Sequence, residues 1–118
     1  NEVSRKDIDM MFEFKVRYLT LTHSQLTNEN FDHLLSKISE DISLNFLEFH
    51  DLPLNRLILL VEILKIKPNY YKLEFFFTEN IRLAQTDQET PETPTIHEIL
   101  MEYKKSRPFV QLEVHESH

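Results

Sequence analysis

The residues best suited to chemistry in this chain are three glutamates and two histidines at recurring positions. Glu48, Glu74 and Glu113 each lie between two apolar residues, and His50 and His115 each follow two places after a glutamate. Paired carboxylates can act as general acid and base, but only in a cleft that raises one pKa. Two imidazoles can bind zinc only when both nitrogens lie about 2.0–2.1 Å from the ion. The elements that carry these residues therefore decide which chemistry is available.

The glutamates belong to a pattern that occurs four times. Each copy has a leucine, an apolar residue three places before it and another two places after it. This spacing is typical of a short strand with one buried face. The central leucines are Leu19, Leu47, Leu73 and Leu112, and the earlier apolar residues are Val16, Leu44, Tyr70 and Phe109. We expect strands over 14–22, 44–50, 70–78 and 109–115.

Apolar residues at helical spacing fill the segments between these strands. They predict helices over 28–39, 54–65 and 96–105. The polar stretch 86–95, which contains two prolines, is interpreted as an inserted loop. Matching the second helix to the first by its distance from the preceding strand predicts the buried residues Leu54, Leu59, Ile63 and Ile66.

Strands separated by helices imply parallel pairing and a right-handed path. We therefore predict an α/β fold in which about four β-α repeats form a short stack around a parallel sheet. The length of 118 residues is that of one domain. Residues 13–118 would form the repeats and residues 1–12 an N-terminal cap or linker. Since the sequence begins with Asn1, we expect a fragment of a longer protein.

Two of the copies read VRYLTLTHSQL (16–26) and LNFLEFHDLPL (44–54). They resemble the L-x-x-L-x-L-x-x-N/C-x-L frame of long leucine-rich repeats, which have one strand and one helix per repeat of about 28 residues. Ribonuclease-inhibitor-like and F-box leucine-rich-repeat proteins are of this type. The Asn/Cys position departs from the frame, because it holds Ser24, Leu52, Thr78 and Ser117. The resemblance implies a protein-binding module, and in the F-box case the substrate-recognition part of a ubiquitin-ligase adaptor.

Residues that alternate with the buried set should share the outer face of the sheet. This face would combine aromatic rings with a row of glutamates, beside a lysine and a histidine. The candidate partner-binding residues are Tyr18, Phe46, Glu48, His50, Lys72, Glu74, Phe76 and Glu113.

Three interpretations of this face are open: a merely solvated surface, a protein-binding surface and a catalytic carboxylate pair. We carry protein binding forward, because aromatic residues outside the core beside like charges are unusual. The partner would be basic or mixed in character. An open sheet face offers no obvious cleft, so we expect no enzyme and no catalytic residue. His50 and His115 are separated by a strand, roughly 10 Å at the usual strand spacing, so we expect no metal site.

Composition excludes several other classes of function. The net charge of −7 argues against nucleic acid or an anionic membrane surface as the partner. With neither cysteine nor glycine, the chain has no thiolate chemistry and no glycine-rich phosphate loop, and we expect no cofactor. The longest apolar run, 57–61, is too short to span a bilayer. The lack of cysteine and of a visible signal peptide favours the cytoplasm or nucleus.

One alternative is a compact α/β regulatory domain similar to the STAS-like anti-sigma-factor antagonists. There a strand such as ISLNFLEF (42–49) precedes a turn and a helix, although those domains usually place a serine where this chain reads HDLPLNR (50–56). Strand order separates the two interpretations: a sequential order favours the repeats and a crossing order the regulatory domain. A sequential sheet also has two open edges, which a second copy or a neighbouring domain could cover.

Overall fold

Four parallel strands and the helices beside them build this computed structural model, which describes residues 2–78 and 94–116. The strands are β1 (Tyr18–Thr22), β2 (Phe46–His50), β3 (Lys72–Phe77) and β4 (Gln111–Glu116). The helices are α1 (Arg5–Glu13), η1 (His23–Gln25, a 3-10 helix), α2 (Asn28–Glu40), α3 (Leu54–Leu64) and α5 (Ile96–Ser106). The predicted α/β class with about four β-α units is confirmed. The expected loop 86–95 lies almost entirely outside the described residues.

The strands lie in the sheet in the order of the sequence, β1-β2-β3-β4. Their register places the four central leucines Leu19, Leu47, Leu73 and Leu112 in one row. The next row along the strands holds Thr20, Glu48, Glu74 and Glu113. The sequential order is the one expected of the repeats. The crossing order that would favour a regulatory domain is not found among the described strands.

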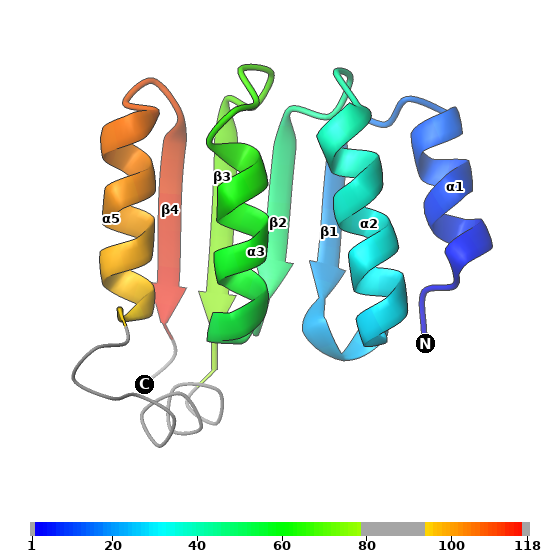
Figure 1. Cartoon of the computed structure of the whole chain (residues 1–118), viewed down its shortest axis with the longest axis horizontal. Helices are drawn as coiled ribbons and strands as arrows, with labels where there is room; N and C mark the ends of the chain where they lie inside the picture. The colour runs from blue at the N-terminus through cyan, green and yellow to red at the C-terminus, as the bar shows by residue number, and fades with distance from the viewer. Residues whose placement is uncertain (1, 79–93, 117–118) are drawn as a thin grey trace.

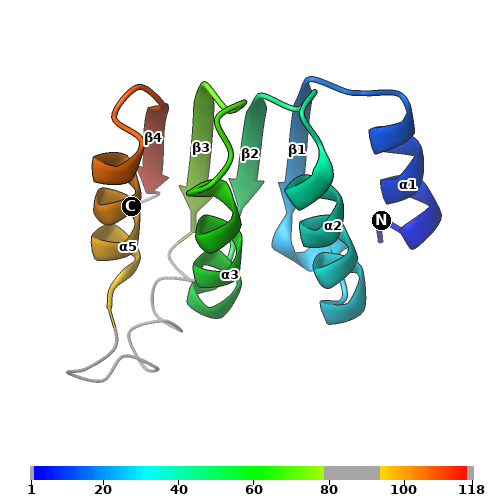
Figure 2. The same ribbon diagram turned by 45° about the horizontal axis from the view of Figure 1, so that its top comes forward.

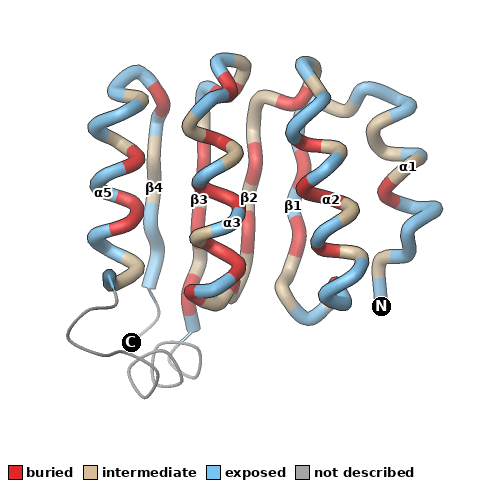
Figure 3. The backbone as a smooth tube through the Cα atoms, viewed as in Figure 1, coloured by how far each residue is buried: buried red, intermediate tan, exposed pale blue. Residues whose placement is uncertain are grey.

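The helices all lie on one face of the sheet (Figures 1 and 2). The core fills the space between the two layers, and both β1–β3 and the helices carry red, buried segments in Figure 3. Phe31, Phe49, Phe75 and Tyr103 are its largest fully buried side chains. No element among residues 2–78 and 94–116 covers the other face of the sheet (Figure 2). We call this uncovered side the open face.

Helix α1 extends the helix layer beyond α2 within the segment expected to be a cap or linker (Figure 1). A capping box starts it: the Ser4 hydroxyl accepts from Asp7 N, and Asp7 Oδ2 accepts from Ser4 N, both at 3.1 Å. Ile8 is fully buried in the core. Asn30 Nδ2 in α2 donates to Val3 O at 3.0 Å, so the start of α1 is tied to the neighbouring helix.

Each predicted strand began two to four residues too early. Phe14 is instead the C-cap of α1, and Lys15 has a left-handed φ of 55° that ends the helix and turns the chain. Leu44 and Tyr70 are buried as expected, but they lie in the segments that lead into β2 and β3. Burial of an apolar residue therefore does not distinguish the start of a strand from the loop before it.

The predicted buried side of the second helix was largely wrong. Leu54 is buried, but Leu59 is 49% exposed, and Ile66 lies beyond the helix and is 73% exposed. Helix α3 buries Leu57, Leu60, Val61 and Leu64 instead. The loop between β2 and α3 is shorter than the one between β1 and α2, so the distance from the preceding strand misleads. The distance to the following strand is constant, since Phe31, Leu57 and Ile96 each precede the next central leucine by 16 residues.

The expectation that Phe109 faces the core is also wrong, because its side chain is 98% exposed and Val110 is buried instead. The turn before β4 explains the shift. Val110 N donates to Arg107 O at 3.1 Å, and Lys104 Nζ donates to Pro108 O at 3.0 Å. These bonds fold residues 107–110 into a tight turn that directs Val110 inward.

Asp51 fixes the bend after β2, next to Leu52, which is fully buried. Asp51 has a left-handed φ of 60°, and its Oδ1 accepts from Thr78 N at 2.7 Å. Its own N–H donates to Phe76 O at 2.7 Å. The bend after β2 is thereby fixed to the end of β3.

Candidate functional site

Three aromatic rings stack across the open face near the carboxyl ends of the strands. His50, Phe76 and His115 occupy matching register positions in β2, β3 and β4. Each histidine ring lies 4.4 Å from the Phe76 ring between centroids, with interplanar angles of 2° and 16°. The two imidazoles are on opposite sides of Phe76 and cannot converge on one ion. In the described part of the chain, no group of three potential ligands is arranged for a metal.

Glu48 is held by two neighbours on the open face. The Tyr18 hydroxyl donates to Glu48 Oε1 at 2.7 Å, and His50 Nε2 lies 2.6 Å from Glu48 Oε2. Burial raises the pKa of Glu48, but the hydrogen bonds from His50 and Tyr18 outweigh it, and the net shift of this pKa is downward. Glu48 is therefore ionised at neutral pH and unsuited to donate a proton as a general acid.

Lys72 bridges the other two glutamates. Its Nζ lies 3.0 Å from Glu74 Oε1 and 3.1 Å from Glu113 Oε2, and hydrogen bonds to both carboxylates raise the pKa of Lys72. Glu74 and Glu113 are direct cross-strand partners, so the lysine relieves a like-charge contact. His115 Nε2 also lies 3.4 Å from Glu74 Oε2. The row of three glutamates is thus partly compensated by one lysine and keeps an excess of negative charge.

A second aromatic group lies at the amino ends of the strands. The rings of Tyr18 and Phe46 are 4.2 Å apart between centroids, and Tyr71 approaches Phe46 edge-on at 6.4 Å. Lys72 Nζ lies 4.9 Å from the centre of the Phe46 ring. Tyr18 and Tyr71 are both more than half exposed. The eight predicted partner-binding residues therefore do share one face, and Tyr71 was missed.

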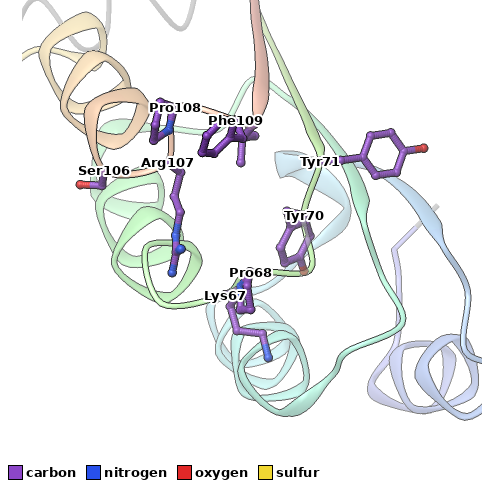
Figure 4. Close-up of a pocket in the computed structure, with 9 residues that line it drawn as sticks. Lys67, Pro68, Tyr70, Tyr71, Ser106, Arg107, Pro108 and Phe109 are labelled. Carbon is purple, nitrogen blue, oxygen red and sulfur yellow. The ribbon is translucent and has the colours of Figure 1, made fainter.

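A groove of about 500 Å³ lies between the start of β3 and the turn before β4 (Figure 4). Tyr70 and Arg107 face it, whereas Tyr71 points away (Figure 4). Arg107 Nε donates to Lys65 O at 2.8 Å, and Lys67 Nζ donates to Ser39 O at 3.1 Å. Both cations therefore satisfy carbonyls at the ends of neighbouring helices. The Tyr70 hydroxyl is buried without a hydrogen-bond partner among the described residues.

The sequence indicates neither Tyr71 nor Phe109 as an exposed residue. Tyr71 directly precedes the outward-facing Lys72, so strict alternation would place it inward, and its exposure follows from the late start of β3. The exposure of Phe109 depends on the turn formed by residues 107–110, and no periodicity reports that turn. Both residues border the groove, with the Tyr71 ring directed away from it, so an exposed aromatic surface continues from the open face around the amino ends of the strands.

The chain was compared with protein-family models and with curated proteins. No protein-family model matches the chain. No curated protein matches it either. None of the helices described above is long and apolar enough to cross a bilayer. The open face, with its stacked rings and paired charges, is left as the feature from which function can be argued.

Proposed function

We propose that this chain is a non-enzymatic protein-interaction module that binds a protein partner through the open face. The supporting observation is the difference between the two sides of one sheet. The inward residues of β2 and β3 are buried beneath helices, while Phe46 and Phe76 in the same strands stand on an uncovered surface. Aromatic residues on a rigid surface are frequent anchors of protein interfaces, because they bury a large area at low entropic cost.

Binding is favoured over catalysis by the electrostatics of the face. Each glutamate already has a hydrogen-bonded or charged neighbour, and the pKa of Glu48 is lowered rather than raised. A fixed pattern of charges of this kind contributes to selectivity and association rate more than to affinity. We therefore assign the rings of Tyr18, Phe46 and Phe76 as anchors and the carboxylates as selective contacts for a partner of basic or mixed character.

We further propose that the stack is a short, degenerate leucine-rich-repeat-like array. The sequential strand order and the single row of central leucines support this interpretation. In an F-box-type adaptor, such a face would recognise the substrate of a ubiquitin ligase. This finer assignment follows from the resemblance of the strand segments to the repeat frame.

Site-specific photo-crosslinking tests whether the open face contacts a partner. A photoreactive phenylalanine analogue replaces Thr20, which is exposed on β1 in the glutamate row. The matched control carries the same analogue at Ser36, which is exposed on α2 in the opposite layer. We expect discrete covalent adducts to other proteins from position 20 and not from position 36. Adducts from position 36 alone, or equal adducts from both positions, would contradict the proposal.

A further inference from the structure

The row of inward residues behind the glutamates is well covered in three strands and open in the fourth. Leu21, Phe49 and Phe75 are 3%, 0% and 1% exposed, whereas their register partner Val114 in β4 is 43% exposed. Figure 3 shows this difference, since β4 is tan and pale blue where the other strands carry red segments. The apolar side of the stack is therefore incomplete at β4.

Among the described strands, none pairs with the backbone of Leu112 and Val114 on the outer side of β4. Gln111 N–H donates to Tyr71 O at 2.8 Å, toward β3. In a parallel ladder successive residues bond to opposite sides, so Leu112 and Val114 direct their N–H and C=O groups away from β3. No described strand lies on that side of β4. An uncovered edge of this kind is a template for a further strand.

Two rows of the open face also end at β4, because no strand among the described residues continues them beyond it. In the ring stack, His115 packs on Phe76 through one side, and no ring among the described residues contacts its other side. Glu113 receives Lys72 from the β3 side and Gln111 Nε2, at 3.3 Å, from its own strand. A fifth strand could therefore add a cation beside Glu113 and a ring beside His115.

We propose that the edge of β4 binds an extended segment of a partner protein as a fifth parallel strand. The segment has apolar residues opposite Leu112 and Val114, a lysine or arginine opposite Glu113 and an aromatic residue opposite His115. Main-chain hydrogen bonds supply the docking, and the alternating side chains supply the specificity. This inference rests on the proposed function, since it names the chemistry of the partner at the edge of the open face.

A second copy of this chain fits the edge less well. A twofold axis would pair two β4 strands antiparallel, and a register centred on Glu113 would bring the Glu113 carboxylates of both copies together. Each copy also has a net charge of −7. The basic segment avoids this repulsion and matches the charge of the edge.

Nuclear magnetic resonance titration of the ¹⁵N-labelled chain with a capped hexapeptide, TLKVFT, tests the proposal. In parallel register its leucine, lysine, valine and phenylalanine lie opposite residues 112 to 115. The matched control peptide is TLEVFT. We expect saturable shifts of the Leu112 and Val114 amides, with TLKVFT binding about fivefold more tightly than TLEVFT, as one exposed ion pair allows. Shifts confined to other strands, or equal affinity for both peptides, would overturn the proposal.

Reversal of one charge on the chain provides the second arm. Glu113→Lys should invert the preference, so that TLEVFT binds more tightly than TLKVFT. An unchanged preference would overturn the assigned register. Sedimentation of the free chain addresses self-pairing: a dimer that TLKVFT does not dissociate would assign the edge to a second copy and overturn the inference.

The crosslinking experiment and this titration test the two proposals separately. Peptide binding at Leu112 and Val114 without adducts from position 20 would retain the edge and reject the open face. Adducts from position 20 without peptide binding would do the reverse.

Discussion

The two faces of this sheet are built from the same strands but show opposite chemistry. Phe75 is almost fully buried beneath the helices, while Phe76, the next residue, stacks between two histidines on the open face. In the same way, Leu47 is buried beneath the helices and Glu48 lies on the open face. Because side chains alternate along a strand, one short segment can stabilise the fold with half of its residues and present a binding surface with the other half. Substitutions on the two faces should therefore separate stability from binding.

Replacement of Phe75 and Phe76 by alanine should give the widest separation in stability. We expect Phe75→Ala to lower the free energy of unfolding by about 3–5 kcal/mol, because it opens a cavity in the core. Phe76→Ala should cost about 1 kcal/mol, since it removes only stacking at a partly exposed position. Urea unfolding of both variants measures the difference. Equal destabilisation by the two substitutions would mean that the open face is also part of the core.

A second prediction concerns pH and the helix-covered side, where His23 lies beside Arg56. Arg56 is buried, and its Nη1 lies 3.0 Å from His23 Nδ1, so that nitrogen must accept and the ring must be neutral. Burial and then the charge of Arg56 lower the pKa of His23 from its usual 6.5. The folded chain therefore binds a proton less readily than the unfolded chain, and its stability should fall as pH drops below about 6.5.

Unfolding in urea at pH 7.5 and 5.5 tests this contribution in the wild type and in His23→Gln. The glutamine can still accept from Arg56 but does not titrate in this range. We expect a smaller loss of stability at pH 5.5 in the variant. An identical loss in both proteins would show that His23 does not contribute.

The smallest of these effects should come from Tyr18 on the open face. Tyr18→Phe removes the hydroxyl that donates to Glu48 and retains the ring beside Phe46. We expect the pKa of Glu48 to rise, with a stability change below about 1 kcal/mol. A carbon-detected titration of the Glu48 carboxyl group measures the shift. If the pKa of Glu48 did not change, the hydroxyl would not be responsible for its low value.

The sequence predicts the rows of the sheet well, for a physical reason. A period of two assigns each residue to a side, and the leucine of each copy sets the register, so Glu48, Glu74 and Glu113 fall in one row as expected. Helices α2, α3 and α5 were also predicted to within one residue of their ends, whereas α1 lies in a segment that was predicted only as a cap or linker. Thr27 caps α2 as an N-cap threonine should, with its Oγ1 accepting from Asn30 N at 3.1 Å.

Features that depend on loops and rotamers could not be predicted in this way. The buried side of α3 depends on the length of the loop before it, so Leu59 was assigned to the wrong side. Because of the turn before β4, Val110 is buried and Phe109 is exposed. The pairing of Lys72 with two glutamates depends on side-chain conformations, which the periodicity of the sequence does not predict. The row of carboxylates was visible in the sequence, but the bridge that Lys72 makes between two of them was not.

The most direct test of the open face is affinity capture by the immobilised chain. Wild type is compared with Phe46→Ala/Phe76→Ala and with the control Ile42→Ala/Ile66→Ala, which removes two exposed side chains from loops beside the helix ends. Melting temperatures verify that all three proteins are folded. We predict that proteins retained by wild type and control bind the Phe46/Phe76 variant roughly 100-fold more weakly, as the loss of two interface anchors implies. Identical partners and affinities for all three chains would contradict the assignment of the open face as the binding surface.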